Sequence, residues 1–98
     1  MLSKIPIFLD KVNQKDLNKE ILRAAIVAEL DAISLYEQMA DLTENDEVRR
    51  VLLDVAKEEK THVGEFQTLL LEQDEEQVRE LGAGKKEVEE ELRKLGGE

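Results

Sequence analysis

Two stretches decide the fold of this chain: ILRAAIVAELDAISLYEQMA at residues 21–40 and VRRVLLDVAKEEKTHVGEFQTLL at residues 48–70. Each contains one row of positions spaced alternately by four and three residues, which is the period of a helix face packed against other helices. The first row is Leu22, Ile26, Glu29, Ile33, Tyr36 and Ala40; the second is Val48, Leu52, Val55, Glu59, His62, Phe66 and Leu69. With a turn at Thr43-Glu44-Asn45, the pattern predicts an antiparallel hairpin of two long helices.

Both rows are interrupted at the same height by residues of the types that commonly act as metal ligands. Glu29 precedes Glu44 by the same number of residues as Glu59 follows it, and His62 lies one helical turn beyond Glu59. At about 1.5 Å of rise per residue, both carboxylates are expected roughly 22 Å from the bend. Two carboxylates and an imidazole should therefore meet on faces that are otherwise apolar.

These three side chains predict a bound cation. A buried carboxylate without a partner costs several kcal/mol, and it escapes that cost by protonation, ion pairing or metal coordination. No lysine or arginine lies on either row. Di-iron carboxylate bundles take one Glu from each of two helices and a Glu-x-x-His pair from each of two others. This chain supplies half of that set, so two copies would complete it.

The predicted hairpin also has more apolar surface than two helices can bury. The additional apolar residues are Ala24, Ala25, Val27, Ala28, Leu30, Ala32, Leu35 and Met39 on the first helix, and Val51, Leu53, Ala56 and Val63 on the second. We expect an all-α antiparallel helical hairpin that forms a four-helix bundle by homodimerisation, since a two-fold axis supplies an identical partner.

The predicted hairpin occupies residues 13–72, with the first helix running from 13–16 to about Leu42 and the second from after Asn45 to about Glu72. Residues 1–12 form an N-terminal arm, whose apolar cluster is expected to dock on the bundle or on a neighbouring subunit.

Residues 73–98 form a C-terminal helical extension. Asp74 is expected to cap a short turn at Glu75–Leu81, and Gly82-Ala83-Gly84 to break the chain. A short third helix then follows at Lys85–Leu95, ended by Gly96-Gly97.

The composition of the chain argues against several classes of partner and metal site. The net charge of −10 disfavours nucleic acid and anionic membrane surfaces as partners, and an acidic field concentrates cations. The absence of cysteine removes thiolate sites, so any metal must be held by oxygen and imidazole nitrogen. No apolar run reaches the ~18 residues of a membrane span, and a cytoplasmic location is the default expectation.

Residues 18–70 resemble the encapsulated ferritins, through Ala28–Glu37 and Glu58-Glu59-Lys60-Thr61-His62. The resemblance implies a ferritin-like hairpin fold and a ferroxidase that oxidises Fe(II) with oxygen at a di-iron site shared across a homodimer interface. It also implies a ring of dimers, expected as a decamer, inside an encapsulin nanocompartment, with the encapsulin shell protein as partner. Calcium, zinc or manganese are expected to be able to take the place of iron at this site.

By position, the resemblance makes Glu29, Glu59 and His62 the iron ligands and Tyr36 a tyrosine beside them. Asp31 matches an acidic position on the path by which metal enters. Ala28 and Leu35 depart from the family at a second acidic position and at a tryptophan position, which puts that path in doubt rather than the ferroxidase site.

Several alternatives remain open from the sequence. Glu58 and Glu65 are either an outer metal relay or a solvated face, and Tyr36 is either beside the metal or a core tyrosine. The chain could instead be a rubrerythrin-like peroxidase, which the missing cysteines weaken, or a helical adaptor without metal. It could be a separate cargo protein or part of a shell fusion.

Overall fold

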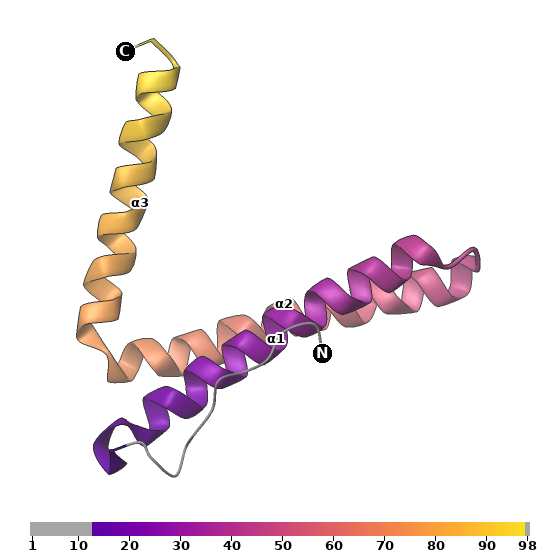
Figure 1. Ribbon diagram of the computed structural model, residues 1–98, viewed down its shortest axis with the longest axis horizontal. Helices are drawn as coiled ribbons and strands as arrows, with labels where there is room; N and C mark the ends of the chain where they lie inside the picture. The colour runs from indigo at the N-terminus through magenta and orange to yellow at the C-terminus, as the bar shows by residue number, and fades with distance from the viewer. Residues whose placement is uncertain (1–12, 98) are drawn as a thin grey trace.

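A computed structural model describes residues 13–97 of the chain, and every regular element in that range is a helix. A 3₁₀ turn, η2 (Gln14–Asp16), leads into α1 (Leu17–Leu42), followed by α2 (Asp46–Gln73) and α3 (Glu75–Leu95). Helices α1 and α2 lie antiparallel along their length, whereas α3 leaves the end of α2 at a steep angle (Figure 1). The predicted all-α hairpin is confirmed, and the predicted N-terminal arm lies outside the described residues.

The turn between α1 and α2 is held by side-chain hydrogen bonds. The Asn45 carboxamide oxygen accepts from the Val48 backbone N–H at 3.0 Å and caps α2, while the Thr43 hydroxyl accepts from the Asn45 N–H at 3.1 Å. Asp46 and Glu47 place negative charge in the first turn of α2, where the helix dipole favours it. The turn therefore fixes where the two helices start to run alongside each other.

Arg49 ties the end of α1 to the start of α2. Its Nε donates to the Ala40 carbonyl at 3.1 Å, its Nη1 to Asp46 at 2.8 Å and its Nη2 to the Thr43 carbonyl. The last carbonyls of a helix have no partner within the helix, so one guanidinium satisfies groups that would otherwise need water.

The buried core of the described residues is small. The buried apolar side chains are Leu22, Ile33, Ala40, Ala56 and Leu70. Leu69, which lies on the second predicted row, is 48% exposed in the single hairpin, and its neighbour Leu70 is buried instead, because one partner helix covers α2 on only one side. The radius of gyration is 17.5 Å, against about 13 Å for a compact domain of 100 residues. The molecule is thus extended and buries only part of its apolar surface.

Helix α3 is one continuous helix of 21 residues, so the predicted break at Gly82-Ala83-Gly84 is wrong. Each glycine costs about 1 kcal/mol relative to alanine in a helix interior, and the flanking Glu, Lys, Arg and Leu residues are good helix formers. Among the described residues, positive φ occurs only at Gly97, with φ 85°, just past the helix end. The predicted terminus at Gly96-Gly97 is therefore confirmed.

Asp74 joins all three long helices at the corner of the molecule. It lies between α2 and α3, and its Oδ1 accepts from the Gln77 N–H at 3.0 Å, which confirms its predicted capping role. Its Oδ2 accepts from Arg23 of α1 at 3.1 Å. Hydrogen bonding from Gln77, aided by the positive charges of Lys19 and Arg23, lowers the pKa of Asp74. None of the described helices is long and apolar enough to cross a membrane.

Candidate metal centre

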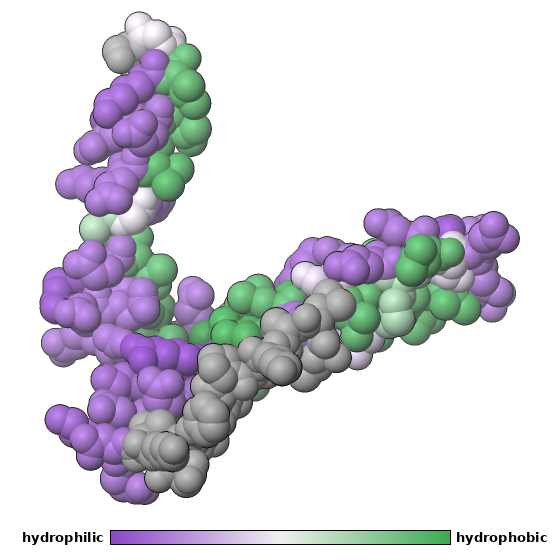
Figure 2. Space-filling model, in the orientation of Figure 1, coloured by the Kyte–Doolittle hydropathy of each residue, from purple (hydrophilic) through white to green (hydrophobic). Residues whose placement is uncertain are grey.

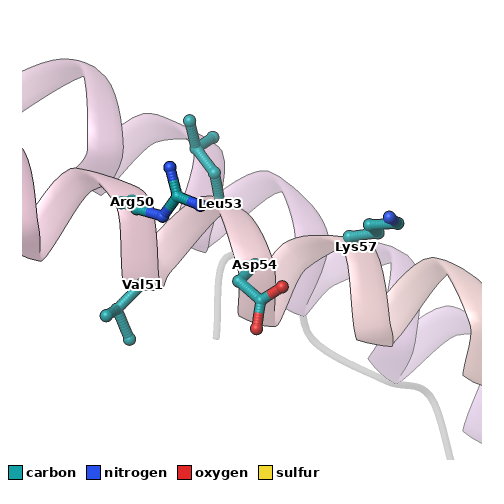
Figure 3. Close-up of a pocket in the computed structure, with 5 residues that line it drawn as sticks. All are labelled: Arg50, Val51, Leu53, Asp54 and Lys57. Atoms are coloured by element: carbon teal, nitrogen blue, oxygen red, sulfur yellow. The ribbon is translucent and has the colours of Figure 1, made fainter.

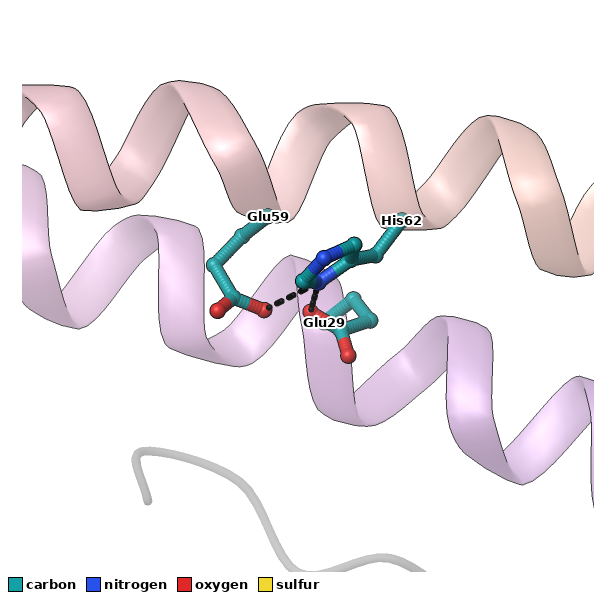
Figure 4. Close-up of side chains that lie close together, drawn as sticks. All are labelled: Glu29, Glu59 and His62. Carbon is teal, nitrogen blue, oxygen red and sulfur yellow. Dashed lines mark ion pairs between the residues drawn. The ribbon is translucent and has the colours of Figure 1, made fainter.

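Glu29 of α1 meets Glu59 and His62 of α2 halfway along the hairpin (Figure 4). One ligand atom from each residue lies within 4.8 Å of the other two. Glu59 and His62 are one helical turn apart on the same face of α2, and Glu29 reaches them because α1 and α2 run antiparallel from a tight bend. The structure brings together the three residues that the matched spacing predicts; their role as metal ligands stays a prediction.

The imidazole of His62 stands between the two carboxylates. Its Nδ1 lies 3.4 Å from Glu59 Oε2 and 3.5 Å from Glu29 Oε2. No lysine or arginine pairs with either carboxylate in residues 13–97. The group carries a formal charge of −2 with a neutral imidazole and still −1 with a protonated one, so His62 alone cannot neutralise it.

The two carboxylates of the cluster are largely buried, which raises the cost of leaving their charge uncompensated. The Glu29 and Glu59 side chains are each 19% exposed, and within the described part of the chain the buried Oε2 of Glu29 accepts no hydrogen bond. A buried acceptor without a partner costs about 1–3 kcal/mol. A cation between the three side chains would remove this cost.

The distances suit a first-row metal ion. Zinc–nitrogen and zinc–oxygen bonds are about 2.0–2.2 Å long, so two ligands of one ion are at most about 4.4 Å apart. The two measured distances from His62 fall inside that limit, and small side-chain rotations would complete the fit. Three ligands leave positions open, and two carboxylates with one imidazole suit iron, manganese or zinc.

The cluster is open on one side, and exposed apolar residues lie further along the same face of α2. The His62 side chain is 43% exposed. Residues seven apart share a helix face, so His62 belongs to the row Val48, Val55 and Leu69, of which Val48 and Leu69 are also exposed. Apolar surface runs along the hairpin in Figure 2. Each chain thus presents a partly exposed polar cluster on a face that also carries exposed apolar side chains.

Lys60 shows why a nearby cation does not neutralise the cluster. Two residues along a helix turn through about 200°, so Lys60 and His62 lie on opposite flanks of α2. There the Lys60 ammonium pairs with Glu37 of α1 at 3.0 Å. This contact was not predicted, because both residues lie outside the two rows.

The remaining predicted site residues do not join the cluster. Tyr36 lies two turns beyond Glu29 on the same face of α1 and is half-buried, and the hydrogen bonds among the described residues do not include its hydroxyl. Asp31 is buried, about 200° around α1 from Glu29. Glu58 and Glu65 are exposed on α2. The roles predicted for these four residues, beside the metal for Tyr36 and in metal uptake for the other three, stay predictions.

A separate hollow of about 490 Å³ lies on α2 alone, lined by Arg50, Val51, Leu53, Asp54 and Lys57. Figure 3 shows these side chains pointing in different directions rather than toward one point. The hollow contains neither Glu59 nor His62 and is distinct from the metal cluster.

Known proteins resemble the chain over most of its length. The family model described as rubrerythrin matches residues 20–94. A ferritin-like–encapsulin shell fusion protein of Pyrococcus furiosus is 59% identical over 92 residues, which are 92% of this chain and 27% of that protein. The encapsulin nanocompartment cargo protein EncC of Myxococcus xanthus is 38% identical over 68 residues, covering 69% of this chain and 52% of that protein.

The chain therefore spans about a quarter of the first relative and about half of the second. Among solved structures, the encapsulated ferritin domain from Pyrococcus furiosus superposes with a TM-score of 0.79 at 59% identity, over 92% of this chain and 94% of that one. The fold, the family model and the sequence identity agree: this chain belongs to the rubrerythrin family and has the fold of an encapsulated ferritin domain.

Proposed function

We propose that the chain is a ferroxidase that oxidises Fe(II) to Fe(III) at a di-iron site shared by two copies. The observation that supports this most directly is the open half-site: Glu29, Glu59 and His62 form an incomplete ligand set, and His62 is 43% exposed on an apolar face. A second hairpin laid on that face would cover the exposed valine and leucine side chains. It would also complete a set of four carboxylates and two imidazoles, as in di-iron bundles.

The three residues have distinct parts in this proposal. The Glu29 and Glu59 carboxylates bind ferrous iron as substrate and favour its oxidation, because their negative charges match the added charge of the ferric state. His62 is held between them and completes a nitrogen and oxygen ligand set without adding charge when neutral. Tyr36 lies two helical turns from Glu29 and outside the ligand set, and its proposed place is beside the completed site rather than on the metal.

The relatives support the cellular setting of the proposal. One is by name a fusion to an encapsulin shell and another an encapsulin cargo protein. We accordingly place this chain inside an encapsulin nanocompartment in the cytoplasm, with the shell protein as partner and a ring of dimers, expected as a decamer, as its assembly.

The match to the rubrerythrin family model favours one second candidate, in which hydrogen peroxide rather than dioxygen accepts the electrons. Both candidates use the same ligands. They differ in the oxidant that reacts faster with the ferrous protein, so parallel measurements with the two oxidants separate them.

The deciding experiment loads the anaerobic full-length protein with ferrous iron and follows ferric absorbance after mixing with air-saturated buffer or peroxide. The wild type should bind one iron per chain and react with oxygen. Glu29→Ala should lose both properties, whereas Glu58→Ala should keep them because Glu58 is exposed and outside the cluster. Full oxidation by Glu29→Ala would refute the proposal, and an anomalous-scattering map of iron-soaked crystals would show whether two copies share the metals.

A further inference from the structure

The side of α1 that faces away from α2 carries a row of residues that are shielded from solvent. The members of this outer row are Leu17, Ala24, Ala28, Asp31 and Leu35, spaced by seven, four, three and four residues. At about 100° per residue, they lie roughly 180–240° around α1 from the row that packs on α2. Asp31 is nevertheless only 8% exposed, and the other four residues are half-buried.

The corresponding side of α2 shows what an uncovered helix face looks like in this hairpin. Arg50, Asp54, Lys57, Thr61 and Thr68 lie opposite the side of α2 that packs on α1, and all five are exposed. The position of Asp54 on α2 is equivalent to that of Asp31 on α1, yet only Asp31 is buried. A helix of this hairpin therefore does not bury its own outer side, and the outer row of α1 must have a cover.

The described elements do not supply that cover. Among them, α1 contacts η2 and α2 but not α3. The 3₁₀ turn η2 ends at Asp16, and Asp31 lies about 21 Å further along α1 at 1.5 Å per residue. Of the chain outside the described range, residues 1–12 adjoin α1, whereas Glu98 follows the far end of α3.

We propose that residues 1–12 dock along the outer row of their own chain, leading from Asn13 toward Leu35. The distance from Asn13 to Leu35 is about 33 Å, with 1.5 Å per residue in α1 and 2.0 Å per residue in the 3₁₀ turn. Twelve residues span up to about 40 Å. Leu42 continues the outer row but lies about 44 Å from Asn13 on the same measure, and it is 81% exposed. The shielded part of the row thus ends near the limit that residues 1–12 can reach.

The composition of residues 1–12 suits this surface. Residues 5–9 read Ile-Pro-Ile-Phe-Leu, an apolar run that needs a surface to cover it. The small side chains of Ala24 and Ala28 leave room for larger ones to lie close to the backbone of α1. A buried carboxylate needs hydrogen-bond donors. With about 3.3 Å per residue, Lys4 and Ser3 come level with Asp31, so an ammonium, a hydroxyl and backbone N–H groups are within its reach.

This docking goes beyond the proposed ferroxidase function and does not depend on it. The outer row lies on the side of α1 away from the metal ligands, so the segment would leave the open face around His62 free for a second hairpin. It would direct pairing of hairpins to that face, because the other apolar side of α1 is already covered.

The absence of native cysteine makes thiol reactivity a direct measure of the cover. In the full-length protein, Ala28→Cys should react with DTNB at least about tenfold more slowly than Thr61→Cys, because the reaction needs an accessible thiolate. Thr61 is the matched control, since it lies within one residue of the same height on the exposed side of α2. Deletion of residues 2–10 should raise the rate of Ala28→Cys to that of Thr61→Cys. Ala56→Cys, at a position 2% exposed, should stay unreactive after the deletion and so show that the hairpin remains folded.

Disulfide formation identifies the chain that supplies the segment. After mild oxidation, Ile5→Cys or Ile7→Cys should form an intrachain disulfide with Ala28→Cys in the same full-length chain. The yield should exceed that of the Ile7→Cys/Thr61→Cys variant at least about tenfold, because cysteines whose Cα atoms are more than about 7 Å apart cannot join without backbone movement. Mixed single variants, analysed by non-reducing mass spectrometry, should remain unlinked.

Three results would overturn the proposal. The first is equal reactivity of Ala28→Cys and Thr61→Cys in the full-length protein, which would show that the outer row is bare. The second is protection of Ala28→Cys that survives the deletion, which would identify a second copy as the cover. The third is disulfides that form mainly between chains. Addition of Glu29→Ala should abolish iron binding and keep Ala28→Cys protected, which separates failure of this proposal from failure of the ferroxidase proposal.

Discussion

Glu29→Gln should raise the stability of the metal-free protein and abolish its stabilisation by metal. In the wild type, Glu29 adds charge to a cluster that His62 cannot neutralise, and its buried Oε2 accepts no hydrogen bond within the described residues. An unsatisfied buried acceptor costs about 1–3 kcal/mol, and Glu29→Gln removes it because an NH2 group in the place of Oε2 carries no charge and can donate to the neighbouring Glu59 carboxylate. Because the side chain is 19% exposed, we expect the low end, about 1 kcal/mol, which corresponds to about 4–8 °C in Tm for a domain of this size.

The measurement is thermal unfolding followed by circular dichroism, at one fixed protein concentration, with EDTA or with excess metal. Metal at a hundred times its Kd should stabilise the wild type by about 2.7 kcal/mol and leave Glu29→Gln unchanged. Glu58→Gln is the control, since its exposed carboxylate should change stability by less than about 0.5 kcal/mol. If Glu29→Gln lowers the metal-free Tm and retains the metal-induced rise, the reasoning about an uncompensated cluster is wrong.

Three further perturbations test the fold. Arg49→Ala should lower the free energy of unfolding by about 1–3 kcal/mol in denaturant titrations, because carbonyls at the end of α1 lose a charged donor; exposed Arg50→Ala should change it by less than about 0.5 kcal/mol, and equal losses would contradict the clamp. Acidification should loosen the corner between α2 and α3: the lowered pKa of Asp74 means that its contribution is complete above about pH 4, the usual aspartate range, and is lost as the pH falls through the lowered value. Spin-label distances from α3 to the hairpin report this, and Asp74→Asn should show the loosened distances without any such acid transition. Gly84→Ala should slow amide exchange in α3, consistent with up to about 1 kcal/mol of added helix stability; faster exchange would show that the glycine is needed there.

The hairpin and its cluster could be predicted because both follow from repeating geometry. The alternating spacing of apolar residues sets which face of each helix is covered. The turn at Thr43–Asn45 and the constant rise of a helix then determine that Glu29 and Glu59 reach the same height. The period and the rise of a helix are the same in every turn, so they place residues relative to one another even when these are many positions apart.

Features that depend on small energy differences or on isolated contacts could not be predicted. The course of α3 through Gly82 and Gly84 depends on a cost of about 1 kcal/mol per glycine, which the neighbouring helix formers offset. Of two adjacent leucines on α2, Leu70 is buried and Leu69 is exposed. This difference depends on the position of the single partner helix α1 and not on a complete four-helix bundle. The contact between Arg23 and Asp74 joins residues 51 positions apart, and surface charges carry no periodic signal.

If two copies share the metal site as proposed, the open face around His62 has a consequence for kinetics. A site divided between two chains exists only while they are together, so at concentrations well below the dimer Kd the number of complete sites falls with the square of the chain concentration. Dilution in a test tube would therefore depress activity per chain. Confinement within a closed shell would do the opposite, because neighbouring copies remain at a high effective concentration whatever the amount of protein in the cell. The compartment would then keep the shared site assembled as well as retain the product of the reaction.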